Sequence, residues 1–122
     1  MGLDMYLFRK EGDERVRIGY WRKANAIHNW FVQNVQKGID ECKEATVSVA
    51  KLKNLRSTVN QVLTAAKEGD FSVANELLPT QGGFFFGSTD YDSYYVEDLE
   101  ATLDILDKAI ATNKACFYQS SW

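Results

Sequence analysis

The alternation of hydrophobic and polar residues along the first twenty positions predicts a β-hairpin. Residues 3–8 alternate between two sides of a strand, and over residues 15–20 the alternation groups Val16, Ile18 and Tyr20 on one side. A polar segment that contains a glycine separates the two runs, as in a hairpin turn. One side of the hairpin is therefore expected to face a hydrophobic core.

Apolar residues recur at three- and four-residue steps in three later segments, which predicts three main helices. These helices are expected at about residues 20–41, 49–68 and 93–113. Ser48 is a suitable N-cap for the second helix, and Asp90 or Asp92 for the third. A shorter helix is expected within residues 70–78, before the chain's single proline.

These elements predict an α+β fold with a small antiparallel sheet of two or three strands. The N-terminal hairpin packs against the three main helices in this prediction. The C-terminal tail, residues 115–122, is aromatic and β-prone, so it is able to add a strand to the hairpin. The length of 122 residues fits a single compact domain spanning residues 1–122.

Composition and charge narrow the classes of partner. The net charge is −3, whereas a generic binder of duplex nucleic acid carries a basic face, so that class is disfavoured. No apolar run approaches the roughly 20 residues that a membrane span needs. The N-terminus lacks a signal-peptide pattern, and Cys42 and Cys116 lack metal-type spacing. We therefore expect a cytoplasmic protein with reduced thiols.

The segment from residue 19 to 30 concentrates the chain's most unusual side chains. It holds two tryptophans, a tyrosine, two cations, two asparagines and the only histidine. Aromatic faces beside cations and amides suit a planar, anionic ligand, and they also suit an anchor in a protein interface. In the alternative interpretation Trp21 belongs to the core, Arg22 and Lys23 are solvated, and His28 bonds a neighbour.

The segment of residues 80–92 is the second unusual region. Three consecutive phenylalanines stand among three glycines, and hydroxyl and carboxyl side chains follow just before a predicted helix. Free N–H groups at a helix N-terminus bind anions, so the loop is able to hold a phosphate or to place its aromatic rings against a partner subunit. It lacks the P-loop ending and the dinucleotide fingerprint. The alternative is a capped helix start whose aromatic residues close the core.

Catalytic chemistry has weaker support in the sequence. Asp90 and Asp92, with His28 or Asp4, are candidate ligands for a metal ion. No nucleophile-elbow or zinc-protease pattern occurs. The residues favour a non-enzymatic protein without a cofactor.

Three segments carry a resemblance to known proteins. Residues 2–7 (GLDMYL), 19–31 (GYWRKANAIHNWF) and 83–95, which include GFFFGSTDY, resemble marker segments of small uncharacterised proteins encoded by phages and prophages. The family has no assigned catalytic residues to carry over. The resemblance implies a setting inside a bacterial host, where small phage proteins block a defence protein or sequester a nucleotide signal.

Together these features predict a non-enzymatic, phage-type accessory protein that counters host defence by binding a small anionic, nucleotide-like ligand. In this hypothesis cations meet phosphate, aromatic rings stack on a base, and polar side chains bond its edges. The predicted ligand-binding residues are Trp21, Arg22, Lys23, Asn25, His28, Trp30, Phe84, Phe85, Phe86, Thr89 and Asp90. The alternatives are an inhibitor that binds a host protein through the same aromatic residues, and a metal-dependent enzyme using Asp90, Asp92 and His28. The surplus of aromatic residues also predicts a homo-oligomer.

Overall fold

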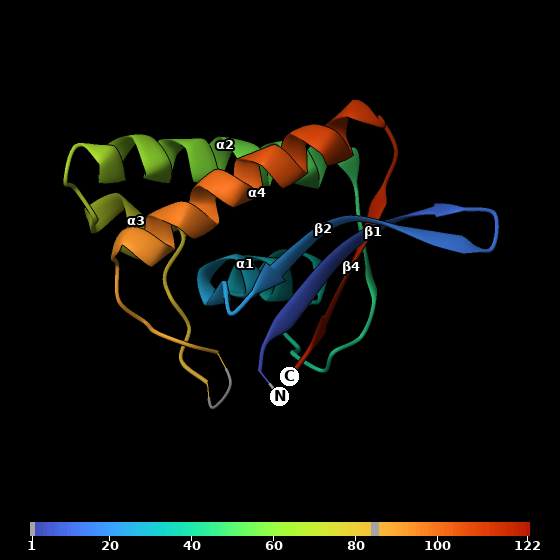
Figure 1. Cartoon of the computed structure of the whole chain (residues 1–122), viewed down its shortest axis with the longest axis horizontal. Helices are drawn as coiled ribbons and strands as arrows, with labels where there is room; N and C mark the ends of the chain where they lie inside the picture. The colour runs from blue at the N-terminus through green and yellow to red at the C-terminus, as the bar shows by residue number, and fades with distance from the viewer. Residues whose placement is uncertain (1, 84–85) are drawn as a thin grey trace.

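The computed structural model describes residues 2–83 and 86–122, so the predicted site residues Phe84 and Phe85 lie outside the described residues. The chain has the predicted α+β fold, with helices packed against one antiparallel sheet (Figure 1). The elements in chain order are β1 (Asp4–Glu11), β2 (Glu14–Arg22), α1 (Asn25–Val35), β3 (Ala45–Val47), α2 (Val49–Lys67), α3 (Ser72–Leu77), α4 (Ser93–Ala111) and β4 (Cys116–Ser121).

The sheet has four strands in the order β2-β1-β4-β3. The predicted hairpin is β1 with β2, and the predicted C-terminal strand is β4, which pairs with β1 so that Asp4 lies opposite Ser121. The fourth strand, β3, was not expected, because three residues are too few to show an alternating pattern. It pairs with the outer edge of β4. The tip of the β1–β2 hairpin extends away from the helices (Figure 1).

A bulge in β2 changes which of its side chains face the helices. Leu7 lies opposite Gly19, but the next residue, Phe8, lies opposite Arg17, so Ile18 is an extra residue in β2. One extra residue shifts the two-residue period of a strand by one position. The alternation predicted across residues 15–20 is therefore broken in the middle.

The consequence is that Tyr20 lies on the opposite side of the sheet from the one expected. Beyond the bulge, Gly19 and Trp21 face the core, and Tyr20 is 41% exposed on the other face. Gly19 lies so close to α4 that an added Cβ would stand 2.3 Å from the Ile105 side chain. The prediction that grouped Tyr20 with Ile18 on the core side was wrong.

The core lies between the inner face of the sheet and the helices. Leu3, directly before β1, and Met5 and Leu7 in its first half have no exposed surface, as the alternation predicts. Tyr118 of β4 is also fully buried, and its ring stacks on Phe31 of α1 with centroids 3.9 Å apart. The stripes of α2 and α4 complete the core, since residues such as Leu55 and Leu106 have no exposed surface.

The first helix is shorter than predicted, while the other two match. Residues 20–22 belong to β2, and Lys23 turns the chain with a φ of 56° before the helix begins at Asn25. At its far end Gly38, with a φ of 78°, donates its N–H to the Val32 carbonyl and ends the helix. Among the described residues, no helix is long and apolar enough to cross a membrane.

Candidate functional site

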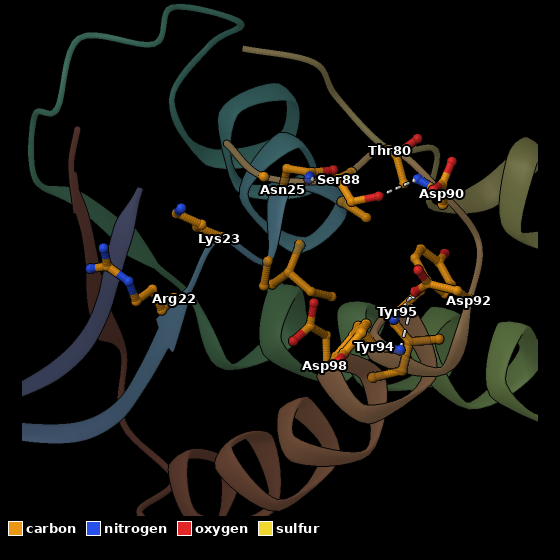
Figure 2. A pocket seen from close by; sticks show the side chains of 15 residues that line it. Arg22, Lys23, Asn25, Thr80, Ser88, Asp90, Asp92, Tyr94, Tyr95 and Asp98 are labelled. Carbon is orange, nitrogen blue, oxygen red and sulfur yellow. Dashed lines mark hydrogen bonds between the residues drawn. The ribbon is translucent and has the colours of Figure 1, made fainter. Parts of the chain in front are cut away.

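The starts of α1 and α4 meet around a hollow of about 290 Å³ (Figure 2). Residues 22–27 form one side of it, and residues of the chain between α3 and α4 form another. The first turns of α4 close it. The two regions that stood out in the sequence therefore lie next to each other and share one concave surface.

Asn25 holds these two regions together. Its side-chain N–H groups donate to the carbonyls of Phe86 at 2.9 Å and Ser88 at 2.8 Å, and its Oδ1 accepts the Gln81 N–H at 2.9 Å. Only 4% of Asn25 is exposed. Because both ends of the amide already have backbone partners, Asn25 positions the loop rather than presenting a free hydrogen-bonding edge.

The cationic side of the hollow is the short connection between β2 and α1. Lys23 donates its backbone N–H to the Leu3 carbonyl at 2.7 Å, and its side-chain stem packs so near Gly87 that a Cβ there would lie 3.1 Å away. Arg22 donates to Asp4 at 2.8 Å across the sheet. Figure 2 shows the Arg22 guanidinium pointing away from the carboxylates of the hollow. Figure 2 shows the Lys23 ammonium group pointing away from those carboxylates as well, so the advantage of Lys23 as a phosphate ligand is that it lies one residue closer to the start of α1.

The N-terminus of α1 opens onto this side. The Asn25 N–H donates to the Lys23 carbonyl, and the first intrahelical bond runs from His28 to the Ala24 carbonyl. The capping position is Ala24, which has no side-chain oxygen to offer. Helix geometry then leaves the N–H groups of Ala26 and Ile27 without an intrahelical acceptor. Both residues line the hollow, at the positive end of the helix dipole.

The opposite side of the hollow carries carboxylates. Asp92 is the N-cap of α4 and accepts the N–H groups of Tyr94 and Tyr95, both at 3.1 Å. The Asp98 carboxylate, one turn further along, is directed into the hollow (Figure 2). Burial, followed by the nearby charges of Glu97 and Asp92, raises the pKa of Asp98 to about 6. Asp90, a predicted site residue, also lines the hollow.

His28 has a structural environment of its own. Its Nδ1 lies 2.6 Å from the Tyr118 hydroxyl and its Nε2 lies 2.9 Å from Asp40, so the interpretation that it bonds a neighbour is confirmed. The ring also meets Phe86 edge-on, with centroids 5.3 Å apart. His28 and Phe86 border a second hollow of about 500 Å³, which is also lined by Trp122.

The side chains of the remaining predicted residues do not line the first hollow. Trp21 is 4% exposed in the core and donates its indole N–H to Thr102 at 2.8 Å. Trp30 is 8% exposed and packs edge-on against Phe31. Thr89 contributes its backbone carbonyl, which accepts the Thr80 hydroxyl proton at 2.9 Å.

The residues of the metal hypothesis do not come together. Asp90 and Asp92 line the first hollow, whereas His28 borders the second. Within residues 2–83 and 86–122, no group of three or more histidine, cysteine, aspartate or glutamate side chains is arranged to hold a metal ion.

The sequence did not predict Asp98, Tyr94 or the open start of α1 as parts of this site, although Tyr94 belongs to the aromatic surplus that suggested an interface. Asp98 looked like an ordinary acidic residue in the first turns of a helix, and it lines the hollow together with residues of the loop that Asn25 holds. Tyr94 is 73% exposed at the rim of the hollow. The available clue to the open helix start was the alanine directly before Asn25, at a position where a capping side chain is usual.

The arrangement suits a small molecule with two different ends. Free N–H groups and Lys23 favour an anionic group on one side, while Asp98 favours a hydrogen-bond donor on the other. The exposed ring of Tyr94 offers a flat surface at the rim. Comparison of the chain with protein-family models, with curated proteins and with solved structures finds no match.

Proposed function

We propose that this protein is a non-enzymatic binding protein for a small nucleotide-like anion, and that the hollow between α1 and α4 is its site. The observation that carries the proposal is the uncapped start of α1 beside Lys23. Phosphate oxygens at this position accept the N–H groups of Ala26 and Ile27 and pair with the Lys23 ammonium group.

The acidic side of the hollow is the proposed binding place for the nucleobase. A nucleobase amino group donates to the Asp98 carboxylate, and the base lies against the exposed ring of Tyr94. A volume of 290 Å³ is near the lower end of the range of about 300–1,000 Å³ for small-molecule sites. A nucleotide therefore keeps its phosphate inside and part of its base at the rim.

The proposed roles of the predicted residues are unequal. Lys23 contacts the anion, Arg22 adds positive charge from the edge of the sheet, and Asn25 holds the loop in place. The cytoplasm of a bacterial host is the proposed setting, and sequestering a nucleotide signal of host defence is the proposed purpose. The resemblance of three segments to phage and prophage proteins supports both.

Calorimetric titration with mono-, di- and cyclic nucleotides tests the proposal, with Lys23→Gly as the diagnostic variant. Glycine adopts the φ of 56° at this position without strain, so the substitution removes the ammonium group and spares the fold. Lys37→Gly is the matched control, because Lys37 has a φ of 58° and lines a different hollow.

Loss of a charge-assisted contact of about 1.5–3 kcal/mol corresponds to an affinity loss of roughly 10- to 150-fold for Lys23→Gly. Lys37→Gly is expected to bind like the wild type. Absence of heat from every nucleotide, or equal losses in both variants, would contradict the proposal.

A further inference from the structure

The face of the sheet that is turned away from the helices carries a pattern unlike the rest of this acidic chain. Side chains of β1, β2 and β4 on this outer face are all partly or fully exposed. They are identified by alternation with the buried positions and by the strand register. The aromatic members are Tyr6, Phe8, Tyr20 and Phe117, and the charged members are Asp4, Lys10, Arg15, Arg17 and Arg22.

The bulge at Ile18 creates this grouping. Without it, Tyr20 would share a face with Ile18 and stand opposite the side that carries Arg15 and Arg17. With it, Tyr20 lies directly across from Tyr6, on the same face as both arginines. Four cations therefore lie among the aromatic residues with two carboxylates, Asp4 in β1 and Glu44 just before β3, although the whole chain has a net charge of −3.

Three of the four aromatic residues lie on the two central strands, β1 and β4, and Tyr20 lies on the neighbouring β2. The rings of Tyr6 and Phe8 are nearly parallel, at an interplanar angle of 10°, with centroids 5.9 Å apart. Phe8 lies directly opposite Phe117 of β4. A shallow hollow of about 620 Å³, which also borders Arg17, lies on this face.

We propose that this outer face binds single-stranded nucleic acid. Exposed aromatic residues on the central strands of a four-stranded antiparallel sheet stack two or three unpaired bases, and surrounding cations meet the phosphates. Stacking needs an exposed base face, which a duplex does not offer, and the cations gathered on this face offset locally the acidity of the whole chain.

The cations are already arranged around a carboxylate that takes the place of a phosphate. Lys10 and Arg15 both bond Glu44, at 2.9 and 2.7 Å, and each also lies 4.1 Å from the centroid of an aromatic ring. Their partners in this arrangement are Phe117 for Lys10 and Phe8 for Arg15. A bound nucleic-acid strand replaces both kinds of contact. Its phosphate takes the place of Glu44 beside the cations, and its base takes the place of the cation over the aromatic ring.

Fluorescence anisotropy with labelled oligo(rU) and oligo(dT) of about 10 nucleotides tests the proposal, because one small domain covers roughly this length. A duplex of equal length is the control ligand, and the RNA and DNA arms show which backbone is preferred. Wild type is expected to bind a single strand in the micromolar range at low salt, with affinity that falls as salt rises. The duplex is expected to bind at least tenfold more weakly.

Arg15→Gln and Arg56→Gln form a matched pair of variants. Each arginine pairs with one carboxylate, and their side chains are 43% and 45% exposed, but Arg56 lies on α2 and bonds Asp107. Arg15→Gln is expected to weaken binding severalfold and to reduce the salt slope by about one, while Arg56→Gln changes neither. Glu44→Gln is expected to strengthen binding, because it releases both cations.

Phe8→Leu and Phe117→Leu remove the ring face but keep an apolar side chain, and each is expected to weaken single-strand binding at least fivefold. Thermal melts confirm that these variants fold. Three results would overturn the proposal: no binding up to about 200 µM protein, which exceeds the usual nonspecific range; equal affinity for duplex; or equal losses from Arg15→Gln and Arg56→Gln. A dimer in light scattering that both leucine variants dissociate, without oligonucleotide binding, assigns the face to a second copy instead.

Discussion

The helices α1 and α4 begin at the same hollow, and their N-termini are capped differently. At α4, Asp92 accepts the N–H groups of Tyr94 and Tyr95. At α1, the capping position is an alanine that has nothing to offer the corresponding N–H groups. The first N–H groups of every helix lack intrahelical acceptors. At α4 a side chain of the protein accepts these hydrogen bonds, whereas at α1 water or a ligand has to accept them.

The charges around the two starts follow the same division. Carboxylates, including Asp98, surround the start of α4, and cations precede the start of α1. A carboxylate near a helix N-terminus stabilises the helix, whereas cations there oppose the dipole unless an anion joins them. The start of α1 is therefore suited to binding, and the start of α4 to stability.

The largest expected effect comes from separating the two regions. Asn25→Ala removes three hydrogen bonds that hold Gln81, Phe86 and Ser88 against α1 and leaves the backbone groups of these residues without their side-chain partner. We expect a loss of about 2–4 kcal/mol in the free energy of unfolding, measured by chemical denaturation. Asn34→Ala is the control, since the exposed Asn34 side chain bonds the Trp30 carbonyl of its own helix; its effect is expected to stay within about 0.5 kcal/mol. Equal effects would mean that Asn25 does not hold the loop.

The second-largest expected effect concerns the capped N-terminus of α4. Asp92→Ala removes the acceptor for two N–H groups of α4 and is expected to lower the free energy of unfolding by about 1–2 kcal/mol. Asp92→Asn keeps a side-chain oxygen and is expected to recover most of that loss. If thermal unfolding shows both variants to be equally destabilised, the charge of Asp92 and not its capping bond is what matters.

A smaller effect concerns Asp98, whose burial raises its pKa to about 6 from an ordinary value of 3.8. The folded state then holds the proton more tightly than the unfolded state, so stability falls as pH rises from about 4 to about 6, and the penalty persists above that range. Asp98→Asn is expected to stabilise the protein by about 1 kcal/mol at pH 7, after allowance for solvent screening of a partly exposed group. The gain should disappear below about pH 4; a gain that is independent of pH would contradict this explanation.

The sequence predicted the parts of the fold that depend on long, regular patterns. The helices at 49–68 and 93–113 match α2 and α4 because their apolar stripes run unbroken for several turns. The alternation around Leu7 likewise identified β1 and its buried side. A regular pattern is local information, and it needs no knowledge of distant partners.

The features that the sequence did not predict depend on local exceptions or distant partners. β2 ends at Arg22 because Lys23 has a positive φ. A positive φ is uncommon for lysine, so the sequence does not indicate this turn. The local clue to the bulge at Ile18 is the neighbouring Gly19, because a glycine within a strand is typical both of a bulge and of a close backbone approach. The roles of Trp21 and His28 depend on Thr102 and Tyr118, which are 81 and 90 residues away along the chain.

The candidate site shows the same limits. The predicted ligand-binding residues came from both the first helix and the loop that follows α3, and Asn25 holds these two segments together. Which polar side chains keep free hydrogen-bonding groups could not be inferred, because intramolecular partners take up Asn25 and His28.

Backbone amide NMR during titration with inorganic pyrophosphate, at constant ionic strength, tests the central claim most directly. This probe has phosphate but no base, so it reports on the helix starts alone. We expect the amide protons of Ala26 and Ile27 to shift downfield and saturate with one dissociation constant, while those of Tyr94 and Tyr95, already bonded to Asp92, stay in place. Larger shifts at Tyr94 and Tyr95 than at Ala26 and Ile27, or no saturable shift at all, would contradict the claim that the start of α1 is the anion site.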